Sequence, residues 1–189
     1  NPSAAAAGPD EVLETAQVGE RIAVANGNAV DWGVLGSAIH ACLAASFTHG
    51  TAAAGGWLSD EAVAQALEGF QVRAHVDAAA VRQQIQAFHA WVQQRWPGCQ
   101  ARAEVPVKAP MPGGQILHGR IDLLLDTPQG FILIDHKSSP HGSEQWGELA
   151  GRYQGQLAAY AQAIETATGR PVREQWLWMV VGGGAVRTC

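Results

Sequence analysis

Two aspartates and a lysine in the second half of the chain have the types and spacing of a metal site. Asp135 and Lys137 end the strand-like residues 131–137, and Asp122 precedes them by one short hairpin. Successive side chains of a strand point to opposite faces, so Asp135 and Lys137 should share one face and His136 the other. Carboxylates hold hard divalent cations, and such cations promote phosphodiester hydrolysis. The pattern therefore predicts metal-dependent cleavage of phosphodiester bonds.

The apolar run that precedes this triplet favours a site over an accidental charge pair. Residues 131–134 are all apolar, which is typical of a central strand buried on both faces. Charged groups at the end of such a strand cost free energy unless they are used. The alternative is a surface ion pair between Asp135 and Lys137, which would contribute only about 0–1 kcal/mol.

His40 and His136 are the candidates that would complete a ligand set. The imidazole of His40 could bind the cation, and so could the backbone carbonyl of His136. A nitrogen ligand shifts the preference from Mg²⁺ towards Mn²⁺ without excluding either. Because His40 shares a helical face with Leu43 and Phe47, it is alternatively a hydrogen-bonded histidine at the core margin. Lys137 would orient or deprotonate water, or neutralise charge in the transition state.

Other polar residues near these positions are candidates for substrate contact. Gln156 and Tyr160 are four residues apart, so one helical face would present both to a phosphate or to the catalytic residues. Tyr160 could instead simply pack with its hydroxyl satisfied. Arg120 and Arg152 supply positive charge close by. The histidines of this region match no zinc pattern, and we expect them in solvent-facing loops: His118, His136 and His141.

Periodicity divides the chain into a helical half and a half rich in strands. Apolar residues recur at helical spacing before about residue 97, and alternation begins at about residue 101. The expected helices cover residues 34–47, 59–70, 81–96 and 145–168, and the expected strands cover 103–107, 116–126, 131–137, 175–181 and 185–189. This order predicts an α/β fold with a mixed central β-sheet flanked by helices.

Length and composition predict one globular domain. The chain has 189 residues, of which 47% are hydrophobic, and its apolar stretches are too short for a membrane span. We assign residues 10–189 to the domain and residues 1–9, which are rich in alanine, to a linker or the edge of a longer polypeptide. Three widely spaced cysteines form no disulfide framework, which favours the reducing cytoplasm: Cys42, Cys99 and Cys189.

The net charge limits how the chain could hold nucleic acid. It carries 17 acidic and 12 basic residues, a formal net charge of −5. This net charge argues against a general positive field as the source of affinity for DNA. Local basic groups or an attached domain must supply it.

Four elements of the sequence occur in the order of one nuclease family. They are His40, the Gly-x-x-Asp motif that ends at Asp122, the Asp-x-Lys motif at Asp135, and the Gln-x-x-x-Tyr motif that ends at Tyr160. This set resembles the RecB-like branch of the PD-(D/E)XK nucleases, found at the C-terminus of UvrD-type helicase-nucleases that process double-strand breaks. The resemblance is clearest over residues 119–160. His136 and Ser138 stand where tyrosine and threonine are common, and neither change removes a ligand.

The resemblance implies a restriction-endonuclease-like core and dependence on Mg²⁺ or Mn²⁺. We expect a metal-dependent deoxyribonuclease that acts on DNA during recombination and double-strand-break repair, with exonuclease action favoured over endonuclease action. Its partners would be single-stranded DNA ends and a helicase motor in the same polypeptide. The alternative is a catalytically weak or inactive nuclease-like module that binds or docks DNA for a helicase.

Overall fold

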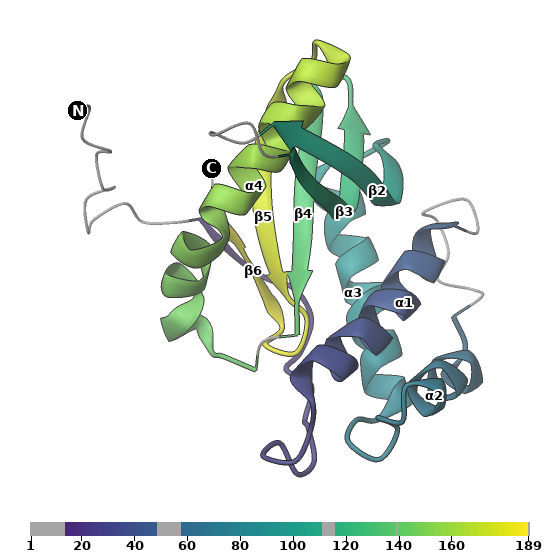
Figure 1. The fold of residues 1–189 in the computed structure, drawn as a ribbon. Helices are drawn as coiled ribbons and strands as arrows, with labels where there is room; N and C mark the ends of the chain where they lie inside the picture. The colour runs from purple at the N-terminus through teal and green to yellow at the C-terminus, as the bar shows by residue number, and fades with distance from the viewer. Residues whose placement is uncertain (1–13, 49–57, 111–115, 139, 189) are drawn as a thin grey trace.

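The computed structural model describes residues 14–48, 58–110, 116–138 and 140–188 (Figure 1). The linker predicted for residues 1–9 lies outside this part of the chain. The elements, in chain order, are β1 (Thr15–Gln17), α1 (Trp32–Thr48), α2 (Asp60–Gly69), α3 (Ala78–Arg95), β2 (Gln100–Pro110), β3 (Ile116–Thr127), β4 (Gly130–Lys137), a 3₁₀ turn (Ser143–Gln145), α4 (Trp146–Thr168), β5 (Val172–Met179) and β6 (Gly184–Arg187).

One mixed six-stranded sheet forms the centre of the molecule. Its strand order is β1-β6-β5-β4-β3-β2. β4 and β5 run parallel, because α4 connects the C-terminal end of β4 to the N-terminal end of β5. The other neighbouring strands are antiparallel. The predicted α/β class with a mixed sheet is confirmed.

Helices cover both faces of the sheet, and β4 is buried between them. Helices α1, α2 and α3 lie on one side and α4 on the other (Figure 1). Ile132 and Ile134 pack with the three-helix layer, whereas Phe131 and Leu133 pack with α4. The apolar run before Asp135 is therefore a central strand, as predicted.

Side-chain caps set the helix ends. Ser59 caps α2 by accepting a hydrogen bond from the backbone N–H of Ala62, as its position in the sequence predicts. Asp77 does the same for α3, which begins at Ala78 and thus three residues earlier than expected. No helix in the described part of the chain combines the length and the apolarity needed to cross a membrane.

Strand β1 is absent from the expected elements. It has only three residues and pairs with β6 at one edge of the sheet. So short an edge strand has no alternation from which it could be recognised. β2 differs as well, since it runs to Pro110 and not to Val107.

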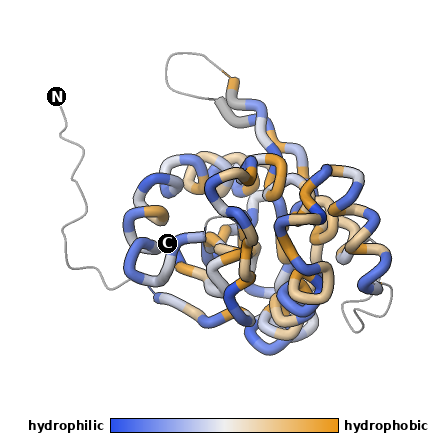
Figure 2. Tube along the Cα trace, turned by 90° about the horizontal axis from the view of Figure 1, so that it is seen from below, coloured by the Kyte–Doolittle hydropathy of each residue, from blue (hydrophilic) through white to orange (hydrophobic). Residues whose placement is uncertain are grey.

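β2 and β3 continue beyond the sheet as a two-stranded arm. β3 pairs with β2 from Ile116 onward, but with β4 only from Leu123. Residues 105–110 and 116–121, hereafter the β2–β3 arm, therefore stand out from the body (Figure 2). The backbone of Glu104 has a φ of 57° where the arm leaves the sheet. Leu123 on the sheet side of this point packs with the three-helix layer, whereas Ile121 on the arm packs with α4.

Candidate metal centre

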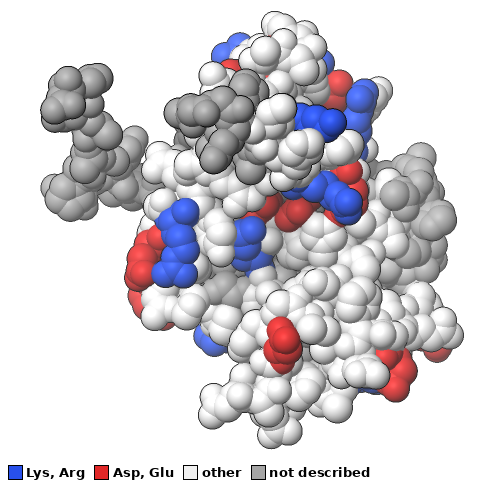
Figure 3. Space-filling model, viewed as in Figure 1, with Lys and Arg blue, Asp and Glu red and all other residues white. Residues whose placement is uncertain are grey.

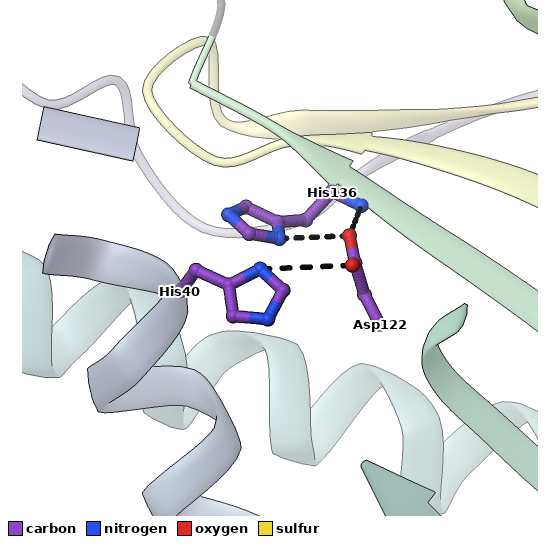
Figure 4. A group of neighbouring side chains, drawn as sticks. All are labelled: His40, Asp122 and His136. Atoms are coloured by element: carbon purple, nitrogen blue, oxygen red, sulfur yellow. Dashed lines mark hydrogen bonds and ion pairs between the residues drawn. The ribbon is translucent and has the colours of Figure 1, made fainter. Parts of the chain in front are cut away.

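Side chains from α1, β3 and β4 converge beside the C-terminal end of β4 (Figure 4). One ligand atom each of His40, Asp122 and His136 lies within 4.8 Å of the others. His136 Nδ1 lies 3.0 Å from Asp122 Oδ2, and His40 Nδ1 lies 3.6 Å from Asp122 Oδ1. The expectation of a solvent-facing His136 is wrong: the residue is 7% exposed on β4, and its ring faces the cluster. His118 and His141, by contrast, are exposed.

Asp122 lies at the point where β3 separates from β4, and this separation positions its carboxylate. Ladder pairing between the two strands stops at Leu123 and Ile134. In the gap beyond, Asp122 Oδ2 accepts a hydrogen bond of 2.8 Å from the backbone N–H of His136. The carboxylate thus links two strands that no longer pair directly, and its second oxygen faces His40.

Helix α1 is fastened to the end of β4, which brings His40 over the site. Asp31 caps the helix by accepting hydrogen bonds from two of its first backbone N–H groups. Ser138 donates a hydrogen bond of 3.0 Å to the carbonyl of Trp32. A Cβ on Gly36 would lie 2.7 Å from Ser138 Oγ, so only glycine permits this approach without a shift. His40 follows one turn later.

Asp135 and Lys137 form a pair on the other face of β4. Lys137 Nζ lies 2.6 Å from Asp135 Oδ2 and 4.4 Å from the centre of the Tyr153 ring on α4. The side chain of Asp135 is 6% exposed, so this is not the surface ion pair that the sequence left as an alternative. The structure places Lys137 at the hollow described below, whereas Asp135 supports it from beneath.

The surroundings hold Asp122 and His40 in the forms that bind cations. Burial alone would raise the pKa of Asp122, but hydrogen bonds and charge from His136 outweigh it and lower that pKa. Burial, assisted by His136, lowers the pKa of His40. Metal ligands must be deprotonated, so both shifts favour metal binding.

Asp135 and Lys137 are shifted by burial and by each other. Burial raises the pKa of Asp135, and the nearby charge of Asp122 adds to that increase. For Lys137, burial acts to lower the pKa, but the carboxylate of Asp135 outweighs it, so the pKa is raised.

Glu104 belongs to this site, although nothing in the sequence singled it out. Its carboxylate contacts His40 Nε2 and lies 2.5 Å from Arg120 Nη1. A non-glycine residue with positive φ is uncommon, and such backbone often marks functional sites. The place of Glu104 in the site depends on how β2 pairs with β3 on either side of it and on its left-handed backbone, and neither is readable from one strand's sequence.

An open hollow of ≈ 740 Å³ lies over these side chains. Arg120 and Glu104 form one wall, and His40, Asp122, His136 and Lys137 line it as well. The α1 wall consists mainly of small residues, which leave room for a bulky ligand to approach: Gly33, Gly36, Ser37, Ala41 and Ala44. Figure 3 shows acidic and basic side chains meeting in this region of the surface.

Among the described residues, those that line the hollow do not include Gln156, Tyr160 or Arg152. Gln156 Nε2 donates a hydrogen bond of 2.9 Å to Tyr160 Oη, and Tyr160 is 4% exposed. A Cβ on Gly119 would collide with that hydroxyl oxygen. Tyr160 therefore supports β3 three residues before Asp122. Arg152 lies on an exposed face of α4, paired with Glu148.

Gly119→Ala tests this support. We expect the variant to lose about 1–3 kcal/mol in free energy of unfolding, because the methyl group overpacks the contact with Tyr160. Urea unfolding measures the loss. The control is Gly155→Ala on α4, where a Cβ meets nothing within 4 Å and alanine should stabilise the helix by about 0.5–1 kcal/mol. An unfolding midpoint for Gly119→Ala equal to that of the wild type would contradict the argument.

Residues 16–187 match the model of the PD-(D/E)XK nuclease superfamily. Among curated proteins, the chain is similar to an ATP-dependent helicase/nuclease subunit of Desulforudis audaxviator (strain MP104C), with 36% identity over 102 residues, which are 50% of this chain and 8% of that protein. A protein with the same name from Pelotomaculum thermopropionicum is 38% identical over 89 residues, or 47% of this chain and 7% of the relative. The matched segment is thus a small part of either relative.

Proposed function

This chain belongs to the PD-(D/E)XK nuclease superfamily, and from that premise we propose that it is the nuclease domain of a helicase-nuclease and hydrolyses phosphodiester bonds in DNA. The observation that carries the proposal is the convergence of His40, Asp122 and His136 in an open hollow that Lys137 also lines. Catalysis would depend on a divalent cation.

The donor atoms fit such a cation. Carboxylate oxygens suit Mg²⁺ and Mn²⁺, and imidazole nitrogens favour Mn²⁺ of the two. His40, Asp122 and His136 would hold the ion. Asp135 lies outside this cluster, on the other face of β4 and near enough for the charge of Asp122 to act on it, and would supply a further carboxylate. When bound, the cation would supply positive charge for the phosphoryl oxygens and acidify water.

The chain's own residues have distinct tasks in this proposal. Asp135 and the Tyr153 ring hold the ammonium of Lys137 in place from two sides. Lys137 would then orient water or stabilise charge that develops on the phosphate. Arg120, anchored by Glu104, would bind a phosphate at the rim. Gln156 and Tyr160 would act by holding β3.

The biological setting is proposed from the relatives' names, which combine a helicase with a nuclease. We assign the chain a role on single-stranded DNA ends in recombination and double-strand-break repair, with exonuclease action favoured. A helicase motor in the same polypeptide would deliver the strand. The cysteines Cys42 and Cys99 are unpaired, which suits the reducing cytoplasm. A buried core lies on each side of the sheet in the described part of the chain, which supports the proposal of a single domain over residues 10–189.

The test is cleavage of an end-labelled single-stranded oligonucleotide with Mn²⁺, with Mg²⁺ and with a chelator. We expect products with either ion and none with the chelator. Cleavage that survives chelation would refute metal dependence, and absence of cleavage with both ions would refute the enzyme.

The net charge of −5 favours one alternative, a module that docks DNA without cutting it. A longer protein that includes the helicase distinguishes the two functions. If its metal-dependent cleavage persists after Asp135→Ala, another domain cuts and this one docks. If Asp135→Ala abolishes cleavage by both the domain and the longer protein, the nuclease is here.

A further inference from the structure

The β2–β3 arm has one face packed against the molecule and one face open. Val107 and Ile121 are buried with α4, and Gly119 lies against Tyr160 of that helix. On the other face, Lys108 pairs across the strands with His118, and Pro106 pairs with Arg120. Directly paired residues share a face of the ladder, so the basic side chains form a row.

This row begins at the candidate metal centre. Arg120 lines the hollow, and Glu104 holds its guanidinium there. His118 precedes Arg120 by two residues on β3 and so lies about 7 Å farther from the hollow along the strand. Lys108 stands beside His118, and both are exposed. Figure 3 shows basic side chains over this end of the molecule and beside the acidic ones in the hollow.

Part of the charge of the row is neutralised, because Arg120 is paired with Glu104, and the charge that is left is that of Lys108. Arg152, Arg170 and Arg82 each have an acidic partner within 4 Å. Among the acids that the structure describes, none forms an ion pair with Lys108. In a chain with a net charge of −5, an unneutralised cation in line with the hollow suits a polyanion that continues past the site.

We propose that the outer face of the arm, formed by Lys108, His118 and Arg120, binds the backbone phosphates of the DNA strand next to the phosphate that is cut. This inference rests on the proposed nuclease function and gives it a direction: the strand passes along the arm and not over α4. Sequence-independent phosphate contacts of this kind hold a single strand in register with a catalytic site.

Lys108→Glu and Arg102→Glu form a matched pair of variants for the test. Both residues are exposed cations of β2, and both changes alter the net charge equally. Arg102 pairs across with Leu124, which packs on the α4 side of the sheet, so it lies away from the row. The measurement is the affinity for a fluorescent oligothymidylate by anisotropy, with chelator present to prevent cleavage, over a series of salt concentrations.

We expect Lys108→Glu to weaken binding roughly ten-fold, as loss of a charged contact does. The slope of log K against log salt should fall by about 0.7, the value for one phosphate contact to a single strand. Arg102→Glu should bind as the wild type does. Equal weakening by both variants would show a general charge effect and overturn the proposal, as would wild-type binding by Lys108→Glu.

Two further measurements keep this result separate from the nuclease function. His118→Glu should repeat the effect, which guards against a folding defect peculiar to Lys108→Glu. In cleavage assays, Lys108→Glu should raise KM and leave kcat unchanged. If the wild type never cleaves DNA but its metal-free binding depends on Lys108, DNA binding by the arm is supported and the nuclease function is refuted. If the wild type cleaves DNA but its binding does not depend on Lys108, the nuclease function is supported and DNA binding by the arm is refuted.

Discussion

Replacement of Lys137 by alanine is expected to remove most DNA cleavage and leave divalent-metal binding in place. The ammonium lies at the hollow, but it is a donor and no metal ligand. Loss of a positioned acid–base or charge-stabilising group lowers turnover by roughly 10²–10⁴-fold. Single-turnover cleavage of an oligonucleotide measures the rate, and calorimetric titration with Mn²⁺ measures the binding.

The control must account for Asp135, which loses its counter-charge. A buried carboxylate without a partner destabilises the fold, so Lys137→Ala alone confounds stability with chemistry. The double variant Asp135→Asn/Lys137→Ala restores neutrality and serves as the folded reference, and Arg102→Ala serves as a cation outside the hollow. Full cleavage by Lys137→Ala would remove Lys137 from the mechanism. Loss of metal binding by a folded Lys137→Ala would make its role one of holding the ligands.

The elements that pack on both sides carry the clearest signals in the sequence. β4 was identifiable because burial on two faces requires an unbroken apolar run. Ser59 and its acidic neighbours predicted the start of α2, and Gly169, with a φ of 68°, ends α4 where expected. Elements at the margin of the sheet had no comparable signal. β1 is too short, and the arm's length depends on pairing that composition does not encode.

In the candidate site, too, the sequence predicts what depends on a local pattern and not what depends on how the elements pack. Alternation along β4 correctly placed Asp135 and Lys137 on one face and His136 on the other. The contacts of Asp122 with the ring and the backbone N–H of His136 depend on where β3 separates from β4, which no local pattern states. Glu104 enters only through a left-handed backbone conformation. The involvement of Tyr160 with Gly119 likewise needs the packing of α4 on the arm.

Asp122→Asn is expected to abolish both metal binding and cleavage, in contrast to Lys137→Ala. Asparagine keeps the size of the side chain and an oxygen that accepts the hydrogen bond from the backbone N–H of His136. It removes the negative charge through which a carboxylate binds Mg²⁺ and Mn²⁺ more strongly than a neutral oxygen does. Since a change in the partners of a ligand already costs roughly 10–100-fold in affinity, loss of the ligand itself should cost at least that much.

Asp126→Asn is the matched control, because it makes the same change four residues later on β3. Asp126 pairs with Arg170 at 2.8 Å, away from the hollow. Titration with Mn²⁺ and thermal unfolding with and without the ion compare the two variants, since an ion that binds only the folded state raises the midpoint. We expect Asp126→Asn to bind and cleave as the wild type does. Equal metal affinity in the wild type and in Asp122→Asn would mean that the three-residue cluster binds no catalytic ion, because the Asp122 carboxylate is the group that joins the two histidines.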